Sequence, residues 1–245
     1  MHASLSGGYV AHRGGALLVE TSASRVSVFF PNPDCPWVPV ALTHDVGPAG
    51  VAPIWTQNGA AALWRSASGK LSACADRCPH RGMRLSHGFV RGEALSCIYH
   101  GWSYGQSGQC VRIPAHPDLV PPEAIKVETQ VAAEAGGVIW VSRGATDTPP
   151  PHIAGFEPLR SITVMASPEQ IRRSVEDARD QDVTLGCSLG GFAVRLLCAD
   201  QGDGATLVHI LVGPDTALTE RIAVSRSAEN LRRTAEVLAD KEPST

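Results

Sequence analysis

The sequence is poor in charged residues and in long hydrophobic runs. Only 18% of its 245 residues are charged and 5% are aromatic, whereas an average soluble protein has about 25% charged residues. With 21 basic and 24 acidic residues, the formal net charge is -3, and no run of basic residues occurs. Nucleic acids and anionic membranes select basic surfaces, so neither is expected as a partner.

No segment has the apolar core of a signal peptide or of a membrane span. Residues 1–34 contain only short apolar runs, such as Val28-Phe29-Phe30, whereas a span needs about 20 apolar residues. We therefore expect a cytoplasmic protein. The seven cysteines are an odd number, and in that compartment they are expected to be reduced, buried or metal-bound rather than paired.

Turn-forming residues, in contrast, are plentiful: the chain has 24 glycines and 18 prolines. Between Trp37 and Val141, short runs of strand-forming residues alternate with turn residues. The clearest of these runs are 37–42, 61–64 and 138–141. This pattern predicts an all-β domain over residues 35–145, after an N-terminal extension of residues 1–34.

A Pro-rich linker is predicted at residues 146–154, because Pro149-Pro150-Pro151 cannot continue a helix or a central strand. The remainder, residues 155–245, mixes strand and helix signals and predicts a small α+β domain. The chain is therefore expected to be α+β overall.

Within this second domain, Ser167-Pro168-Glu169-Gln170 has the form of a capping box, which predicts a helix over 168–179. A strand is expected at 161–165, and the runs 192–197 and 206–212 predict a hairpin. Ser227 is expected to cap a second helix, in which one apolar stripe would pack on a sheet. The stripe consists of Leu231, Ala235 and Leu238.

Two short motifs carry the chemistry: Cys78-Pro79-His80 and, after sixteen intervening residues, Cys97-Ile98-Tyr99-His100. Two thiolates and two imidazoles suit a 2Fe-2S cluster in which the cysteines hold one iron and the histidines the other. Neutral imidazoles make the cluster less negative, which raises its potential. A zinc knuckle uses the same residue types, but a Cys-x-His pair is cramped for zinc-finger spacing.

The segments Cys78-Pro79-His80-Arg81-Gly82 and 97–102 resemble the two cluster loops of Rieske domains, in particular those of ring-hydroxylating and demethylating oxygenases. The resemblance implies a Rieske 2Fe-2S cluster held by Cys78, His80, Cys97 and His100. Met83 and Tyr99 stand where Rieske proteins of the cytochrome complexes have further cysteines.

Two other residues of these loops are expected to lie near the cluster. Arg81 would be a rim charge for docking, and Trp102 would pack under the loops. Trp102 also stands where Rieske proteins of the cytochrome complexes have a serine that bonds a cluster sulfide. Fewer such hydrogen bonds imply a lower potential, as in the oxygenase type.

Oxygenases of this family also have a helix-grip domain with a mononuclear iron, held by two histidines and one carboxylate. Here Glu176, Asp177 and Asp180 fall on that motif, but Val183 and Ser188 stand at the two histidine positions. Such a domain usually needs about 200 residues, far more than residues 155–245 provide. We therefore expect a truncated, helix-grip-like domain without a mononuclear iron.

Asp180 stands where the family has a carboxylate that connects a cluster histidine of one subunit to the iron site of the next. The resemblance thus makes Asp180 a candidate for an electron path. An exposed Asp at a helix end is the plainer interpretation.

The leading hypothesis is an oxidoreductase component that transfers single electrons in a ring-hydroxylating or demethylating oxygenase system, and that is not an oxygenase on its own. Its expected partners are a ferredoxin or flavin reductase and a separate oxygenase subunit, and we expect it to be oligomeric. One alternative is a short catalytic oxygenase with other iron ligands, such as His209 with Asp or Glu residues. Another is a redox-sensing or assembly subunit.

Overall fold

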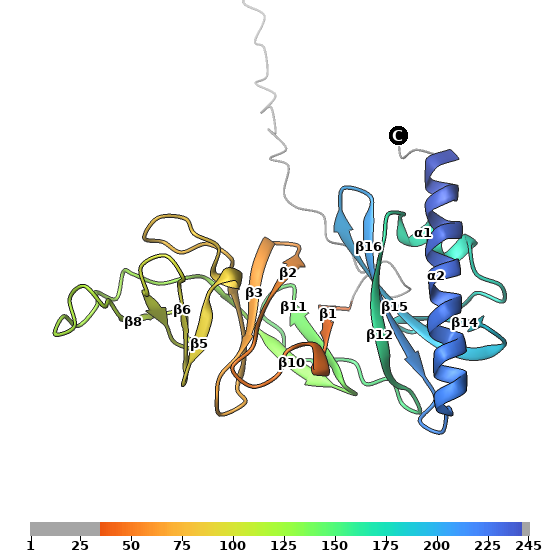
Figure 1. The fold of residues 1–245 in the computed structure, drawn as a ribbon, viewed down its shortest axis with the longest axis horizontal. Coiled ribbons are helices and arrows are strands. Elements are labelled where there is room, and N and C mark those ends of the chain that lie inside the picture. Colours follow the sequence, from red (N-terminus) through yellow and green to blue (C-terminus); the bar gives the residue numbers. More distant parts are fainter. Residues whose placement is uncertain (1–34, 242–245) are drawn as a thin grey trace, which may run out of the picture.

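The computed structural model describes residues 35–241 (Figure 1). In this part of the chain, four antiparallel sheets and two α-helices confirm the expected α+β class. The extension predicted for residues 1–34 lies outside the described residues.

The N-terminal part contains three of the sheets. The first has the order β1-β11-β10, formed by β1 (Trp37–Leu42), β10 (Ala132–Ala135) and β11 (Val138–Ser142). The second has the order β2-β3-β4-β9, formed by β2 (Val51–Thr56), β3 (Gly59–Arg65), β4 (Leu71–Ala75) and β9 (Thr129–Gln130). The strands predicted at 37–42, 61–64 and 138–141 are confirmed, since they lie in β1, β3 and β11.

The third sheet lies at one end of the molecule (Figure 1) and has the order β5-β6-β7-β8. It is formed by β5 (Phe89–Arg91), β6 (Ala94–Ser96), β7 (Ser103–Tyr104) and β8 (Cys110–Arg112). Two 3-10 helices, η1 (Thr43–Asp45) and η2 (Leu85–His87), complete this half. A buried core that includes Trp64, Leu85 and Leu95 joins the second and third sheets.

The second half is one five-stranded sheet, here called the C-terminal sheet, with the order β12-β16-β15-β14-β13. Its strands are β12 (Glu157–Val164), β13 (Arg179–Gln181), β14 (Thr184–Leu189), β15 (Phe192–Gly202) and β16 (Ala205–Val212). The hairpin predicted from 192–197 and 206–212 is confirmed by the pairing of β15 with β16.

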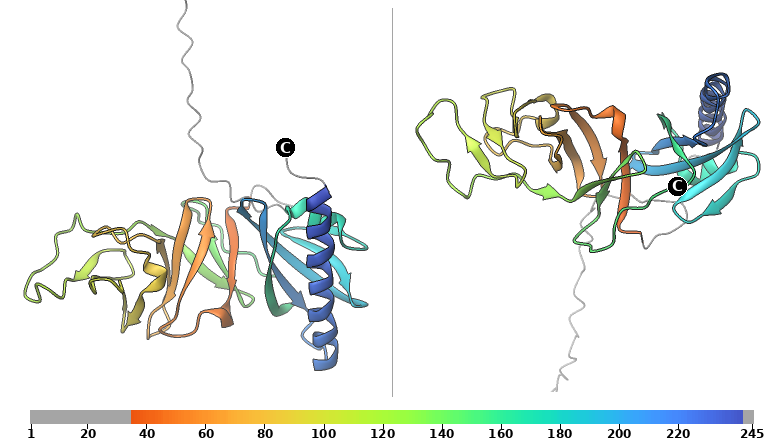
Figure 2. Two further views of the ribbon diagram at one scale, coloured as in Figure 1. Left: turned by 45° about the horizontal axis from the view of Figure 1, so that its top comes forward. Right: turned by 90° about the horizontal axis from the view of Figure 1, so that it is seen from below.

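Helices cover one face of the C-terminal sheet, and the N-terminal half covers the other (Figures 1 and 2). The helices are α1 (Pro168–Arg173) and α2 (Leu218–Lys241). From α2, Val224, Ala228, Leu231 and Ala235 are buried against the sheet. On the other face, Trp37 and Trp140 share a core with Leu197 and Leu211. The two halves are therefore joined by buried apolar surface as well as by residues 143–156.

The first helix is shorter than predicted. Its capping box forms, because Ser167 Oγ accepts from Gln170 N at 3.3 Å and Gln170 Oε1 accepts from Ser167 N at 2.8 Å. The expected end at Arg179 is wrong, because the helix stops at Arg173 and residues 179–181 pair with β14. Pairing with a neighbouring strand here outweighs local helix propensity.

The second helix is longer than predicted. It begins at Leu218, not after Ser227, and the Glu220 carboxylate accepts a hydrogen bond from Ala217 N at 2.8 Å. This carboxylate satisfies a backbone donor at the true start of the helix. Leu231 and Ala235 of the predicted stripe are buried, whereas Leu238 is only partly buried.

Candidate metal centre

Two loops at the end of the molecule that carries β5 to β8 have matching backbone geometry. In the first loop (residues 78–83), Cys78 N donates to Met83 O at 2.8 Å and Gly82 N donates to Cys78 O at 2.8 Å. In the second loop (residues 97–102), Cys97 N donates to Trp102 O at 2.9 Å and Gly101 N donates to Cys97 O at 2.9 Å. Each loop thus begins with its cysteine and closes on itself in the same way.

A glycine in each loop makes this closure possible. Gly82 has φ +73° and Gly101 has φ +70°, a region that side chains disfavour. At Gly101, an added Cβ would also lie 2.9 Å from Pro114 Cγ. The loop geometry therefore favours glycine at the position four residues after each cysteine.

Buried polar groups fix the two loops on the sheet. Before the first loop, the buried Asp76 carboxylate accepts hydrogen bonds from Arg84 Nε at 2.7 Å, Ser86 N at 2.6 Å and Ser86 Oγ at 2.7 Å. Beside the second loop, the hydroxyls of Ser96 and Ser103 are 2.9 Å apart, and Ser103 Oγ donates to Gly101 O at 3.1 Å. These bonds make each loop a rigid support for its side chains.

The two cysteine thiols lie on the inner side of the loops. Cys78 and Cys97 are each 2% exposed, and neither forms a disulfide. Burial, and then the neighbouring Cys78, raise the pKa of Cys97 above its ordinary value. The two thiols are neighbours in an apolar core, an arrangement that can hold a cation between them.

Tyr104 reaches the same thiols from β7. Its hydroxyl lies 3.1 Å from Cys78 Sγ, and the residue is 1% exposed. Burial, followed by the contact with Cys78, raises the pKa of Tyr104. The phenol therefore keeps its proton and can donate a hydrogen bond to a Cys78 thiolate.

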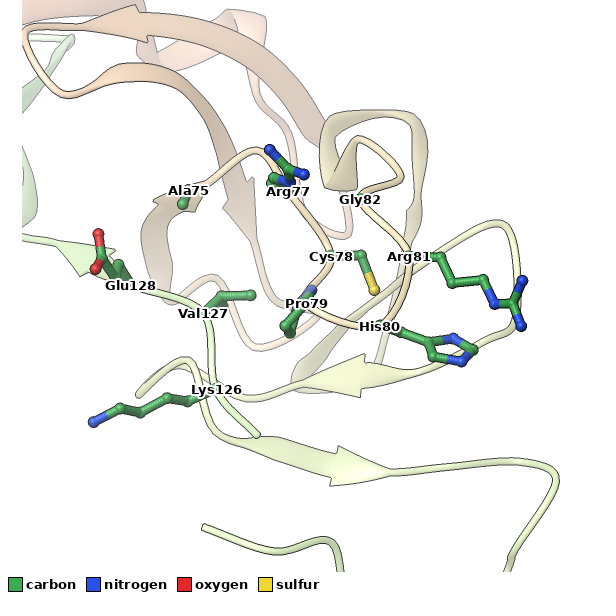
Figure 3. Close-up of a pocket in the computed structure, with 10 residues that line it drawn as sticks. All are labelled: Ala75, Arg77, Cys78, Pro79, His80, Arg81, Gly82, Lys126, Val127 and Glu128. Atoms are coloured by element: carbon green, nitrogen blue, oxygen red, sulfur yellow. The ribbon is translucent and has the colours of Figure 1, made fainter. Parts of the chain in front are cut away.

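The two imidazoles lie on the outer side of the loops. His80 is partly buried and His100 is exposed, and their ring centroids are 4.7 Å apart. Desolvation, followed by the charges of His100 and Arg81, lowers the pKa of His80. Figure 3 shows His80 and Arg81 extending from the first loop, with Cys78 beside them. A neutral imidazole is the form that binds a metal.

Aromatic rings flank both imidazoles. Trp102 is stacked on His80, with centroids 4.3 Å apart and planes at 3°. Tyr99 lies 3.9 Å from His100 with planes at 32°. Trp102 also packs against the core beneath the loops.

The donor set fits a 2Fe-2S group with mixed ligands. Two buried thiols come together on one side and two more accessible imidazoles on the other, each pair containing one residue from each loop. This set would supply two sulfur and two nitrogen ligands to such a group.

A cavity of about 420 Å³ lies beside the first loop (Figure 3). Ten residues of the first loop and of the segments next to it line this cavity. They are Ala75, Arg77, Cys78, Pro79, His80, Arg81, Gly82, Lys126, Val127 and Glu128. In Figure 3 the charged ends of Lys126 and Arg81 point in opposite directions, so they do not converge on one ligand.

The other five cysteines are buried, as expected for thiols without ligand spacing. They are Cys35, Cys74, Cys110, Cys187 and Cys198. Cys74 lies in β4, and burial raises its pKa to about 12. This pKa keeps Cys74 protonated near neutral pH.

The residues at the helix-grip motif positions do not come together with the loops. Asp180 is exposed on the edge strand β13, and its Oδ1 lies 3.4 Å from Arg172 Nε. The neighbouring strand β14 is at the opposite end of the molecule from β8 (Figure 1). Val183 is 3% exposed within the core between the two halves. Within residues 35–241, no three His, Cys, Asp or Glu side chains gather as they would around a single metal ion.

His209 is also accounted for by packing. It is fully buried in β16, and its Nδ1 lies 2.8 Å from Ser161 Oγ. Burial lowers its pKa to about 4, and the Pro39 backbone and Asp45 oppose that shift only in part. His209 is therefore a neutral histidine next to the N-terminal half.

Sequence reasoning missed Tyr104. Its signal was present, because a tyrosine just after the second loop, in a strand with buried side chains, needs a partner for its hydroxyl. The stacking of Trp102 on His80 joins residues from two different loops and was visible only in the structure.

The fold and the paired loops define an iron-sulfur domain of the Rieske type. Residues 36–129 match the family described as the Rieske [2Fe-2S] domain. This chain therefore contains a Rieske domain, whose cofactor is a 2Fe-2S cluster.

Curated relatives share this part of the chain. Oxidoreductase NdmD of Pseudomonas putida is 41% identical over 109 residues, which are 44% of this chain and 18% of NdmD. The 4beta-methylsterol monooxygenase of Methylococcus capsulatus is 37% identical over 131 residues, which are 49% of this chain and 34% of that protein. The matches thus span about a third or less of these relatives, which are named as an oxidoreductase and a monooxygenase.

Solved structures extend the likeness of fold. NdmA of Pseudomonas putida CBB5 has a TM-score of 0.65 at 17% identity, covering 82% of this chain and 80% of NdmA. Apo dicamba monooxygenase has a TM-score of 0.66 at 17% identity, covering 84% of this chain and 85% of that chain. Because the aligned part of this chain is longer than the matched Rieske domain, the likeness of fold includes much of the C-terminal sheet.

Among the helices of residues 35–241, none combines the length and the apolar composition of a membrane span.

Proposed function

We propose that this protein is the electron-transferring component of a Rieske oxygenase system, with Cys78, His80, Cys97 and His100 as the cluster ligands. The observation that carries the proposal is that two loops of matching geometry bring these four residues together in pairs, thiol beside thiol and imidazole beside imidazole. When bound, the cofactor supplies one-electron redox chemistry.

The surrounding residues suit this role. Cys78 and Cys97 are buried, which protects thiolate ligands from solvent, while Tyr104 can donate a hydrogen bond to Cys78. His100 is exposed, so a partner protein can approach this side of the loops. A redox centre that exchanges electrons with other proteins needs such an accessible edge.

The C-terminal sheet supports a carrier rather than an oxygenase. The space between this sheet and its helices is filled by apolar side chains, among them Ile171, Leu196 and Leu231. On the other face, Val183 is buried against the N-terminal half. A substrate site needs a concave pocket with converging polar groups, whereas both faces of this sheet are occupied by packed side chains.

We also propose the domain boundaries: a Rieske domain at 35–145, a linker at 146–154 and a small α+β domain at 155–245. The structure places irregular backbone at 143–156, between β11 and β12. Trp37 Nε1 donates to Thr148 O at 2.9 Å, so the linker contacts the first sheet.

The proposed partners are a ferredoxin or flavin reductase as electron donor and a separate oxygenase subunit as acceptor. The names of two relatives support this division: one is the oxidoreductase NdmD, and another is the oxygenase subunit of 3-chlorobenzoate-3,4-dioxygenase from Comamonas testosteroni. We further propose a cytoplasmic oligomer in which Asp180 contributes to the electron path between subunits.

A redox titration of the full chain tests the proposal. The wild-type protein should take up and release about one electron per chain reversibly, with a Rieske-type EPR signal in the reduced state. His80→Ala and His100→Ala should lose that signal, while the matched control His87→Ala, an exposed histidine in η2, should keep it. A wild-type protein without reversible one-electron behaviour would refute the proposal.

A further inference from the structure

The four rings near the loops form one continuous aromatic array, in the order Tyr99, His100, His80, Trp102. The centroid distances along it are 3.9, 4.7 and 4.3 Å. The two histidines occupy the middle, and each has a further aromatic ring as its other neighbour. We infer that Tyr99 and Trp102 are positioning residues, which hold the planes of the two ligand imidazoles. This inference rests on the proposed function, because it assumes that His80 and His100 are ligands.

The contact between Trp102 and His80 is the stronger half of the array. Planes within 3° of each other at 4.3 Å give face-to-face overlap of the rings. An imidazole that binds a metal through one nitrogen can rotate about the metal–nitrogen bond. A large flat ring stacked on one face of the imidazole restricts this rotation. Trp102 therefore fixes the orientation of the His80 ring, as a hydrogen-bond partner does for other metal-binding histidines.

The backbone determines where Trp102 points. Its carbonyl accepts the hydrogen bond from Cys97 N that closes the second loop, and Gly101 before it has φ +70°. Trp102 belongs to the second loop, yet it stacks on a histidine of the first. The indole thus couples the two loops, so that the position of one imidazole depends on the closure of the opposite loop.

Tyr99 has the same relation to His100 at the outer end of the array. It is 55% exposed and lies 3.9 Å from the His100 ring at a 32° tilt. Because Tyr99 is exposed and tilted, it restrains His100 less than Trp102 restrains His80. The array is therefore rigid at its inner end and looser at the side where a partner approaches.

Pairs of variants that differ in ring shape test this inference on the full chain. Trp102→Phe keeps a flat ring, whereas Trp102→Leu keeps apolar bulk without one; Tyr99→Phe and Tyr99→Leu form the second pair. Trp55→Leu is the matched control, since Trp55 is 40% exposed in β2 and outside the array. Circular dichroism checks that each variant folds.

Two readouts report on the imidazoles directly. Pulsed EPR of the reduced protein gives the nitrogen couplings of the ligand histidines, and visible absorbance with an iron chelator gives the rate of iron loss. Trp102→Leu should shift one nitrogen coupling and lose iron about threefold to tenfold faster than wild type, the range expected for one aromatic pair. Trp102→Phe and Trp55→Leu should match the wild type in both readouts.

The failures can be told apart. If the wild-type protein shows no Rieske-type signal, the proposed function itself is wrong. If the wild-type signal is present and both Leu variants keep its nitrogen couplings and iron-loss rate, only the positioning role is refuted. Should Trp102→Leu not fold, Tyr99→Leu decides alone, because replacing this exposed residue leaves the core intact and should still shift the second nitrogen coupling.

Discussion

The two halves of the molecule use histidine and cysteine in opposite ways. In the N-terminal half, Cys78 and Cys97 are buried beside two imidazoles that face outward. In the C-terminal half, Cys198 and His209 are fully enclosed by the sheet and its neighbours. Residue type alone therefore does not make a metal centre. The loops bring two thiols together and two imidazoles together, whereas the C-terminal sheet surrounds its polar groups with packed side chains.

The largest expected effect is a difference in iron content between two variants, each of which replaces a buried cysteine of one half. Cys97→Ser should abolish iron and sulfide binding, because it removes one of the two proposed thiolate ligands. Cys198→Ser places a hydroxyl in the core at a cost of about 1–3 kcal/mol in the free energy of unfolding, but it should keep full iron content. Iron analysis and chemical denaturation of both variants measure the contrast. Equal iron loss in both would erase the distinction between the halves.

The second effect concerns His209 and pH. Its pKa of about 4 in the folded protein lies below the ordinary value of 6.5, so the unfolded chain takes up this proton first as pH falls. This histidine's contribution to stability is therefore intact above pH 6.5 and declines by about 3 kcal/mol between pH 6.5 and 4.

Urea denaturation across that pH range measures the decline, with His209→Gln as the comparison. The Gln variant should lack this part of the pH dependence, whatever its stability at neutral pH. An unchanged slope in the variant would show that other groups are responsible.

The third effect, on the redox potential, concerns Tyr104. Its hydroxyl lies 3.1 Å from Cys78 Sγ, and a hydrogen bond to a thiolate ligand favours the reduced state, which carries more negative charge. Tyr104→Phe should therefore lower the midpoint potential by an amount on the order of 50 mV. Protein-film voltammetry measures this shift, and Tyr99→Phe, which removes an exposed hydroxyl, is the control. A potential that rises in Tyr104→Phe would contradict this role.

The smallest expected effect on stability is at Asp180. Its ion pair with Arg172 is exposed, so Asp180→Asn should change the free energy of unfolding by less than about 0.5 kcal/mol. If Asp180 contributes to an electron path, this variant should nevertheless slow electron transfer to a separate oxygenase subunit in stopped-flow measurements. An unchanged transfer rate would leave Asp180 as a surface residue only.

The sequence allowed the loops to be predicted more fully than the second half. Cys78 and Cys97 each stand within three residues of a histidine, so the metal-binding residue types are visible in short stretches of sequence. The strand at 37–42 likewise follows from a local run of apolar residues. The end of α1 at Arg173 depends on pairing between β13 and β14, which no local signal of 168–179 reveals. The contacts of Trp102 and Tyr104 likewise join separate segments, so they required the folded structure.

Iron and acid-labile sulfide content of anaerobically purified protein, with EPR before and after addition of nitric oxide, tests the central claim most directly. A carrier should contain about two irons and two sulfides per chain, a Rieske-type signal after dithionite reduction, and no high-spin signal from nitric oxide. A further iron per chain that gives a high-spin signal with nitric oxide would contradict the account and indicate an oxygenase site.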